Sequence, residues 1–380
     1  MKFIDYQIRG GEHPDLEREE IERQVAQMTL DLFMTEPKYK EKGLPWLFNL
    51  MWFQTIYCSR DKKILDYLFK KKPYPEFCEI EVTTRCDMRC KLCEHTYWKV
   101  PPKDMTFEEF KKIVDEFPTL KWAGMTGIGQ SMLNKDYLKM MKYLKDRNVF
   151  IENFDNFKHI TPEVGKEMID MGLDKLYVSL DAAKESTFNL MQVGADWDSV
   201  MANIKAFDAY KKEKHLHYPE LWFHFIMTKE NIDEMEDYLQ MIHDLGVEVE
   251  TVQFTKMLHN FKEVKDTHVE ITNEKIESVL KKALELGIRA SFNMNTASSE
   301  EKTPIKFCSV WTQPFIFADG TVIPCCSLNE QNDRPWQMKT QMGNVLKDGM
   351  RKVWGNFGKM ADELNKGNIP EVCTRCVLYR

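Results

Sequence analysis

The chain has 380 residues, 43% of them hydrophobic, and a formal net charge of −7. This size and composition allow two or three packed domains and exclude a disordered chain. The negative charge argues against a nucleic-acid-binding protein, because such proteins present a basic surface.

The amino terminus and the cysteine content indicate the compartment. Residues 1–5 lead into charged sequence, without the apolar run of a secretory signal peptide. Ten cysteines in such a chain favour metal binding in a reducing compartment over disulfides. We therefore expect a cytoplasmic protein.

We treat residues 1–75 as a helical extension before the first predicted strand. Residues 43–59 within it are uncharged, include Trp46, Trp52 and Tyr57, and have lysine or arginine on both sides. A membrane-spanning helix needs about 20 apolar residues, so this segment is too short. Two interpretations remain. It forms a helix in a bilayer interface, which would place the protein peripherally at the inner membrane face, or a buried helix packed on the next domain.

Residues 76–300 alternate short apolar runs with amphipathic stretches. The predicted strands are Phe77–Thr83, Trp122–Thr126, Val149–Glu152, Leu176–Leu180, Trp222–Met227 and Thr251–Phe254. The predicted helices are Phe107–Phe117, Tyr137–Arg147, Pro162–Met171, Ser199–Lys212, Ile232–Leu245 and Asn273–Leu286. Helix-start signals are the capping-box-like Thr106-x-x-Glu109 and Asn231-x-x-Glu234, and Pro162 after Thr161. Strands separated by helices predict an α/β fold with parallel pairing and right-handed crossovers.

Three cysteines follow the first predicted strand in a C-x3-C-x2-C pattern, Cys86, Cys90 and Cys93. Three thiolates can hold three irons of a four-iron cluster and leave the fourth iron without a protein ligand. An open metal position is typical of a catalytic site. The alternative is a zinc site completed by His95, because three cysteines and one histidine form an ordinary zinc shell.

The cysteine motif resembles that of the radical S-adenosylmethionine (radical SAM) superfamily. The resemblance implies a 4Fe–4S cluster whose open iron binds SAM and cleaves it reductively, giving a 5′-deoxyadenosyl radical. It also implies a partial (β/α)6 barrel of the TIM type, with the chemistry at the carboxyl ends of the strands. Leu92 matches the family's bulky position beside the adenine.

Two further segments resemble SAM-contacting motifs of the family, each with one departure. Gly127, Gly129 and Gln130 match its Gly-Gly-Glu motif, with glutamine in the place of glutamate. Ser179, Asp181 and Gln192 match its strand-four serine and downstream Arg-x-Gly, with glutamine in the place of arginine. Asp181 has an alternative role as a cap of the following helix.

Other polar residues are candidates for substrate contact. Residues 152–156 stand where the family often has Thr-Asn-Gly, and the alternative is a loop turn built by asparagine and aspartate. His224 on the fifth predicted strand faces either the barrel or the helices.

Residues 301–380 form a third predicted domain. Cys308, Gly320 and Cys325 match the Cys…Gly-x4-Cys element of the SPASM domain, an iron–sulfur appendage of many radical SAM enzymes, and Asp319-Gly320 predicts a hairpin. The resemblance implies one auxiliary 4Fe–4S cluster held by Cys308, Cys325, Cys373 and Cys376. Spacing alone would favour a four-thiolate zinc site over a cluster.

The resemblance therefore implies an enzyme with two 4Fe–4S clusters and SAM, reduced by a small flavodoxin- or ferredoxin-type protein. We expect hydrogen abstraction from an unactivated carbon, followed by C–C bond formation or oxidation. Our first substrate hypothesis is a lipid or isoprenoid-like chain, because of residues 43–59 and the many aromatic and methionine residues. The alternatives are a peptide-modifying enzyme and a noncatalytic metal-binding protein.

Overall fold

The computed structural model describes residues 18–57, 62–257, 259, 261–294, 308–326, 334–370 and 373. Its strands form one sheet in the order β10-β9-β8-β1-β2-β3-β4-β5-β6-β7. They span β1 Phe77–Ile80, β2 Trp122–Gly124, β3 Phe150–Asp155, β4 Lys175–Ser179, β5 Glu220–Met227, β6 Thr251–Lys256, β7 Ala290–Asn293, β8 Phe315–Ile316, β9 Thr321–Ile323 and β10 Gly343–Asn344.

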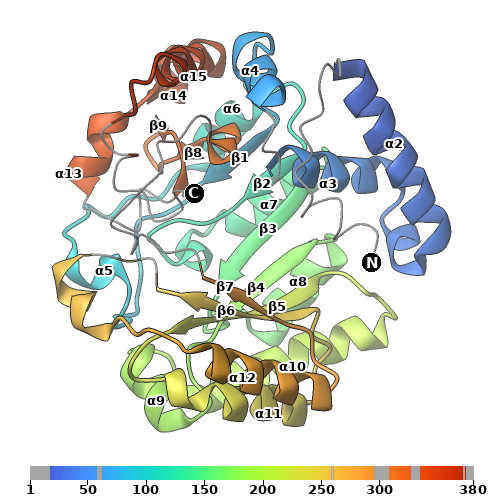
Figure 1. Ribbon diagram of the computed structural model, residues 1–380, viewed down its shortest axis with the longest axis vertical. Helices are drawn as coiled ribbons and strands as arrows, with labels where there is room; N and C mark the ends of the chain where they lie inside the picture. Colours follow the sequence, from blue (N-terminus) through green and yellow to red (C-terminus); the bar gives the residue numbers. More distant parts are fainter. Residues whose placement is uncertain are drawn as a thin grey trace.

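Strands β1 to β7 pair in parallel in chain order and curve into an incomplete barrel (Figure 1). All six predicted strands are confirmed, with end points a few residues from those expected. The partial barrel is confirmed as well. The seventh strand, β7, was not predicted, because its four residues are only partly buried and carry no apolar run.

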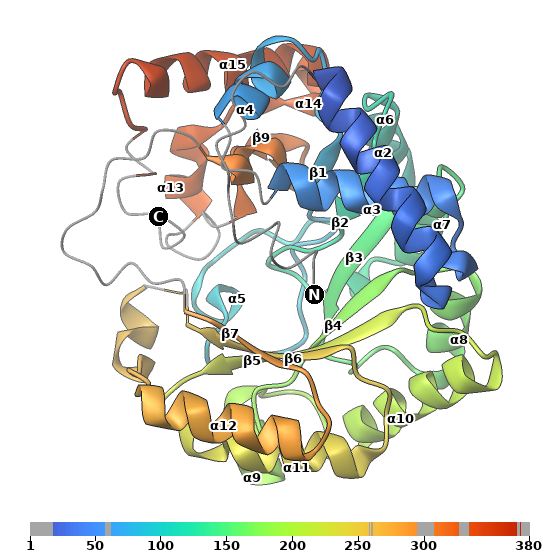
Figure 2. The same cartoon turned by 45° about the vertical axis from the view of Figure 1, so that its right-hand side comes forward.

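Helices cover the outer face of this barrel, and others frame both ends of the sheet (Figures 1 and 2). They are α2 Arg18–Thr35, α3 Leu44–Tyr57, α4 Lys62–Lys70, α5 Glu94–Tyr97, α6 Phe107–Asp115, α7 Tyr137–Lys145, α8 Pro162–Asp170, α9 Glu185–Met191, α10 Trp197–Glu213, α11 Met235–Leu245, α12 Asn273–Glu285, α13 Arg334–Gln337, α14 Val345–Asp348 and α15 Met350–Asn365. The six predicted helices are α6, α7, α8, α10, α11 and α12.

Two of the three predicted helix starts are confirmed. Thr106 and Glu109 form a reciprocal capping box, and the Thr161 side chain accepts a hydrogen bond from the amide of Val164. The capping box at Asn231 is wrong. Its side-chain amide instead donates to the carbonyl oxygens of Asp181 and Ile226, both at 2.9 Å. Asn231 therefore ties two strand ends together.

The barrel interior is polar and aromatic. Phe225 packs on Tyr238 of α11 with ring centroids 4.7 Å apart, so its neighbours on β5, including Trp222 and His224, face inward. The backbone register places Glu79, Gly124, Glu152, Lys175 and Glu220 in one inward-facing row. Above this row Phe154 stacks on Tyr177 with centroids 4.2 Å apart. His224 thus faces the barrel and lies 2.9 Å from the Thr255 hydroxyl.

Helix α3 closes the amino-terminal end of the barrel. The indole of Trp46 donates to Asp174 and that of Trp52 to Glu76, each at 2.8 Å, and both acceptors directly precede strands. Phe53 stacks on Trp122 of β2 at 4.4 Å. Trp46 and Trp52 are at most 3% exposed, so the buried-helix interpretation holds for Leu44–Tyr57 and their indoles are unavailable to a bilayer interface. Residues 58 and 59 lie outside the described residues. Among the described helices, none combines the length and apolar character needed to cross a membrane.

The third predicted domain joins the barrel sheet directly. Its first strand, β8, pairs in parallel with β1, and the β8–β9 hairpin turns at Gly320, whose φ of 82° favours glycine. The predicted hairpin is therefore confirmed. Helix α15 packs beside α4, so a helix of the third predicted domain and one of the amino-terminal extension lie side by side (Figure 2).

Candidate functional site

Cys86, Cys90 and Cys93 lie on the loop between β1 and α5, at the carboxyl end of β1. The amide of Cys93 donates to the carbonyl of Cys90 at 3.2 Å, and the Thr96 hydroxyl donates to the same oxygen at 2.7 Å. All three are free thiols. Burial raises the pKa of Cys86, and that of Cys90 to about 12. A bound metal centre would instead lower the pKa of these thiols, because coordination deprotonates a thiol.

The spacing of the thiols does not favour a single zinc ion. His95 directs Nε2 to the carbonyl oxygen of Thr84 at 3.1 Å, and its buried Nδ1 forms no hydrogen bond with the described residues. Four ligands around one zinc would lie about 3.8 Å apart, given zinc–sulfur bonds of about 2.3 Å. Among the described residues, the three cysteine sulfurs do not all lie within 4.8 Å of one another. This wider spacing and the all-thiolate donor set fit a cluster of several irons.

Gly127, Gly129 and Gln130 pack directly on the cysteine loop. The amide of Gln130 donates to the carbonyl of Arg85 at 2.8 Å. A Cβ at position 129 would lie 2.8 Å from that same oxygen and closer still to the carbonyl of Thr83. A Cβ at position 127 would meet the Glu81 side chain. Only glycine allows this approach, which brings the predicted SAM-contacting loop against the cysteine ligands.

Gln130 is buried, and its amide group donates to Asn156 Oδ1 at 3.2 Å. The Asn156 amide in turn lies 2.9 Å from the sulfur of Met88, which is inside the cysteine loop. The turn after β3 continues to Phe157, whose φ of 61° is a value usually taken by glycine. Residues 152–155 thus lie in β3, and the side chains of Asp155 and Asn156 shape the turn that reaches the cysteine loop by accepting from the amides of Phe157 at 2.7 Å and Lys158 at 2.9 Å.

Ser179, Asp181 and Gln192 are brought together at the end of β4. The Gln192 side chain donates to the carbonyl of Ser179 at 2.9 Å and accepts from the amide of Asp181 at 3.4 Å. Asp181 Oδ1 accepts from the amide of Ile226 at 2.7 Å, and the residue that precedes α9 is Lys184, so the alternative role of Asp181 as a helix cap is wrong. Burial raises the pKa of Asp181 to about 7.

The segment around Gln192 also pairs with the cysteine loop. The amides of Arg89 and Lys91 donate to the carbonyls of Val193 and Met191, both at 2.8 Å. Leu92 is buried in a small apolar cluster with Met191, Met257, Phe261 and Val264. The structure thus collects all the predicted SAM-contacting segments around one loop. Their individual contacts with SAM stay predictions.

Sequence reasoning missed the ion pair that braces this loop. Arg85 donates to Asp104 through Nε at 2.9 Å and Nη2 at 2.6 Å, and the Thr83 hydroxyl donates to the same carboxylate at 2.6 Å. Bidentate pairing of this kind fixes geometry as well as charge. The two residues are 19 positions apart in the chain, and no local pattern indicates their contact.

Of the predicted auxiliary-cluster ligands, Cys308, Cys325 and Cys373 are described and Cys376 lies outside the described residues. Cys325 lies two residues after the end of β9, and both Cys325 and Cys373 are buried. The neighbouring Cys326 hydrogen-bonds to Glu79 inside the barrel. This is consistent with Cys325, rather than Cys326, as the ligand.

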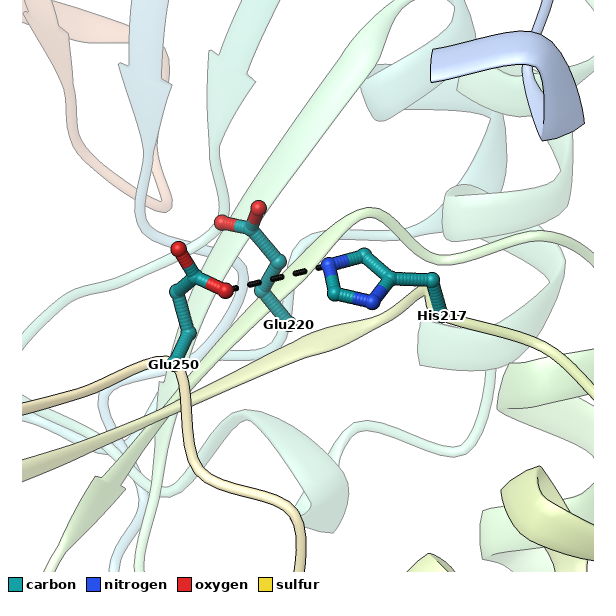
Figure 3. A group of neighbouring side chains, drawn as sticks. All are labelled: His217, Glu220 and Glu250. Atoms are coloured by element: carbon teal, nitrogen blue, oxygen red, sulfur yellow. Dashed lines mark ion pairs between the residues drawn. The ribbon is translucent and has the colours of Figure 1, made fainter. Parts of the chain in front are cut away.

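A separate group of ligand-type side chains lies at the other end of the barrel. His217, Glu220 and Glu250 have ligand atoms within 4.8 Å of one another (Figure 3). Lys38 lies 3.2 Å from Glu220 and 3.4 Å from Glu250, and Arg289 lies 2.7 Å from Glu250. Because these cations already balance the carboxylates, the group is an ion-pair network that fastens the extension to the barrel.

Comparison with known proteins agrees with this geometry. The model of the radical SAM superfamily matches residues 80–242, and that of an iron–sulfur cluster-binding domain, SPASM, matches residues 308–377. The chain is 29% identical to a tungsten-containing aldehyde ferredoxin oxidoreductase cofactor-modifying protein of Pyrococcus furiosus. This match covers 46% of the chain and 49% of that protein, so the chain spans about half the length of this relative.

Solved structures show the same fold at low identity. Streptococcus suis SuiB bound to its precursor peptide SuiA gives a TM-score of 0.56 at 13% identity, over 88% of this chain and 75% of SuiB. The protein anSMEcpe with bound AdoMet and a peptide gives 0.55 at 16% identity, over 79% and 85%. Residues 80–242 therefore form a radical SAM domain and residues 308–377 an iron–sulfur cluster-binding SPASM domain.

Proposed function

We propose that this chain is a radical SAM enzyme that modifies a peptide. Cys86, Cys90 and Cys93 would hold the SAM-binding cluster. The residues that would contact SAM are Leu92, Gly127, Gly129, Gln130, Ser179, Asp181 and Gln192. When bound, the cluster and SAM supply a radical that removes hydrogen from an unactivated carbon. The observation that carries the proposal is the packing of both predicted SAM-contacting segments on the cysteine loop through backbone hydrogen bonds.

The barrel interior supports a polar substrate over a lipid. Lys175 lies 3.2 Å from Glu152 and 3.8 Å from the centre of the Trp222 ring, and Glu79 has a buried oxygen without a hydrogen-bond partner. Lys175 and Glu152 already pair with each other, so the group that an apolar chain would leave buried without a partner is the Glu79 oxygen, which is costly. The lipid hypothesis also relied on residues 43–59, whose aromatic side chains pack under the barrel.

The comparisons with known proteins also favour a peptide substrate. SuiB and anSMEcpe share the fold of this chain, and both structures contain a peptide. The polar interior and these two proteins support the peptide hypothesis that we first held as an alternative.

In this proposal Cys308, Cys325, Cys373 and Cys376 would hold an auxiliary 4Fe–4S cluster. Four thiolates leave no open iron, so this cluster would exchange electrons rather than bind the substrate. Strand β8 of the domain that contains these cysteines pairs with β1 of the barrel sheet. This pairing would keep the cluster at a fixed position relative to the barrel interior.

The test is anaerobic product analysis of the reconstituted protein with SAM and dithionite. A deuterated peptide pool and a deuterated lipid extract are supplied separately. We expect 5′-deoxyadenosine in both, with deuterium transferred only from the peptide pool, and no 5′-deoxyadenosine from the Cys90→Ala variant. Deuterium transfer from the lipid alone would refute the peptide proposal. Absence of 5′-deoxyadenosine from the parent protein would favour the noncatalytic alternative.

A further inference from the structure

The inner face of the barrel is accessible to a ligand. On β5 the inward-facing side chains of Trp222 and His224 are partly exposed, although their outward-facing neighbours are buried. The same alternation holds on β3, where Glu152 and Phe154 are partly exposed. Because these side chains point toward the centre of the barrel, their exposed atoms face its interior. A side chain of a bound substrate can therefore reach them.

Two carboxyl groups in this interior lie on either side of a glycine. Glu79, Gly124 and Glu152 are neighbours in register on β1, β2 and β3. A Cβ at position 124 would lie 3.0 Å from Cγ of Glu79 and 2.9 Å from the ring of Trp122. The Glu79 side chain therefore leans over Gly124, in the direction of Glu152.

One of these two carboxyl groups is only partly paired. Glu152 has an ion-pair partner, because Lys175 lies 3.2 Å from it. Glu79 is 8% exposed and hydrogen-bonds to Cys326, yet its Oε2 has no hydrogen-bond partner among the described residues. Buried polar atoms without a partner are rare in folded proteins, because losing water without a replacement is costly. Oε2 is therefore a candidate acceptor for a group that the substrate supplies.

The surroundings of Glu79 favour a positively charged group over a neutral one. Burial and the nearby charge of Glu152 raise the pKa of Glu79 to about 8, so its ionised form lacks a compensating charge. Lys175 does not supply it, because its ammonium group is held by Glu152 and lies 3.8 Å from the centre of the Trp222 ring. A second cation beside Glu79 would balance this carboxylate as Lys175 balances Glu152.

We propose that the space beside Glu79, over Gly124, binds a cationic side chain of the peptide substrate, a lysine ammonium or an arginine guanidinium. The inference rests on the proposed function, because it names the side chain by which a peptide would be held. Glu79 lies in the same row as Lys175, which precedes Ser179 by four residues on β4, or about 13 Å along the strand. Glu79 would therefore select and position the peptide at a distance from the predicted SAM contacts.

The test measures peptide binding without turnover. Immobilised, anaerobically reconstituted protein is supplied with SAM, without a reductant, and with pools of short random peptides that are blocked at both ends. The pools differ at one position, which holds arginine, its neutral analogue citrulline, lysine or neutral acetyl-lysine, and contain no other basic residue. Retained peptides are quantified by mass spectrometry. The variant is Glu79→Gln, which keeps the shape of the side chain and removes its charge. The control is Glu167→Gln, at an exposed position.

We expect the parent and Glu167→Gln to retain the cationic peptides about tenfold more than their neutral counterparts, because hydrogen bonds between charged groups are the strong ones. Glu79→Gln should lose most of this preference. Equal retention of cationic and neutral peptides by the parent, or of none, would overturn the inference, as would an unchanged preference in Glu79→Gln.

Deuterium transfer under dithionite separates this inference from the proposed function. The same pools are supplied in deuterated form, and we expect faster transfer to 5′-deoxyadenosine from the cationic pools. Equal transfer from cationic and neutral pools would overturn the cation inference and leave peptide modification standing. Transfer from a lipid extract alone would refute the proposed function, and the inference with it.

Discussion

Single residues fix the geometry of the cysteine loop, and Gly129 does so by having no side chain. It lies against the backbone of Thr83 and Arg85, immediately before Cys86. Its importance was visible in the sequence only through the family resemblance, because glycine-rich loops after strands are common. The contact that makes the glycine obligatory joins two loops more than 40 residues apart and has no sequence signal.

Gly129→Ala should destabilise the protein by about 2 kcal/mol or more, because the added methyl group forces the two loops apart. It should also lower the iron content after reconstitution. The control is Gly355→Ala in α15, where an added Cβ has no neighbour within 4 Å. That change should stabilise the helix by about 0.5–1 kcal/mol. Equal behaviour of the two variants in denaturant unfolding would contradict the packing described for Gly129.

Glu79 makes stability depend on pH. Burial raises the pKa of this carboxyl from 4.5 to about 8. The folded protein therefore holds a proton that the unfolded chain releases between these values, and its stability falls as pH rises from about 4.5 to 8. Glu79→Gln should flatten this fall and stabilise the protein at pH 8 by up to about 4 kcal/mol. Urea unfolding at pH 5.5 and 8 measures the effect. The control Glu167→Gln, at an exposed position, should keep the parent's dependence of unfolding free energy on pH. An equally steep dependence in Glu79→Gln would contradict the assignment of this pH effect to Glu79.

Elements with a regular apolar period were predictable from the sequence, and elements defined by contacts were not. The six strands and six helices of the barrel follow from alternation and helical spacing. Asn231 resembles a capping residue, yet it bonds to strand ends that only the fold brings near. Strand β7 forms by pairing with the exposed edge of β6, although the residues of β7 are not strongly apolar. For α3, the composition allowed either a bilayer interface or the protein interior. The hydrogen bonds from its indoles to Asp174 and Glu76, which precede β4 and β1, show that the helix is buried.

Trp52→Ala should cost about 3–5 kcal/mol in unfolding free energy, because it removes a buried ring from α3. The exposed Leu284→Ala should change stability by less than about 0.5 kcal/mol. In flotation with anionic vesicles the full chain should remain with the soluble fraction. Flotation of the chain, combined with a stable Trp52→Ala variant, would mean that α3 faces a bilayer.

At the scale of the whole molecule, the auxiliary domain and the barrel share one sheet and one buried carboxylate. Glu81 on the loop after β1 accepts from the amide of Ile128 at 3.1 Å, from that of Ala318 at 3.3 Å and from Arg334 at 2.8 Å. One residue thus links the SAM-contacting loop to the auxiliary domain. The sequence predicted both domains but not this junction, because Ala318 and Arg334 lie more than 230 residues from Glu81 along the chain.

Arg334→Leu should destabilise the protein by about 3 kcal/mol, because Glu81 is 1% exposed and would lose its only described ion-pair partner. The control is Lys142→Ala, which breaks the exposed pair with Asp146 and should cost no more than about 0.5 kcal/mol. Similar costs for the two variants in denaturant unfolding would mean that the junction contributes little.

The most direct test of the account is electron paramagnetic resonance of the anaerobically reconstituted, dithionite-reduced protein, with and without SAM. A variant with alanine at Cys308, Cys325, Cys373 and Cys376 isolates the proposed SAM-binding cluster. We predict a reduced 4Fe–4S signal in this variant that changes shape when SAM is added, and no such signal when Cys86, Cys90 and Cys93 are also replaced by alanine. A signal that ignores SAM, or thiols that retain only zinc, would contradict the central claim that these three cysteines leave one iron open to SAM.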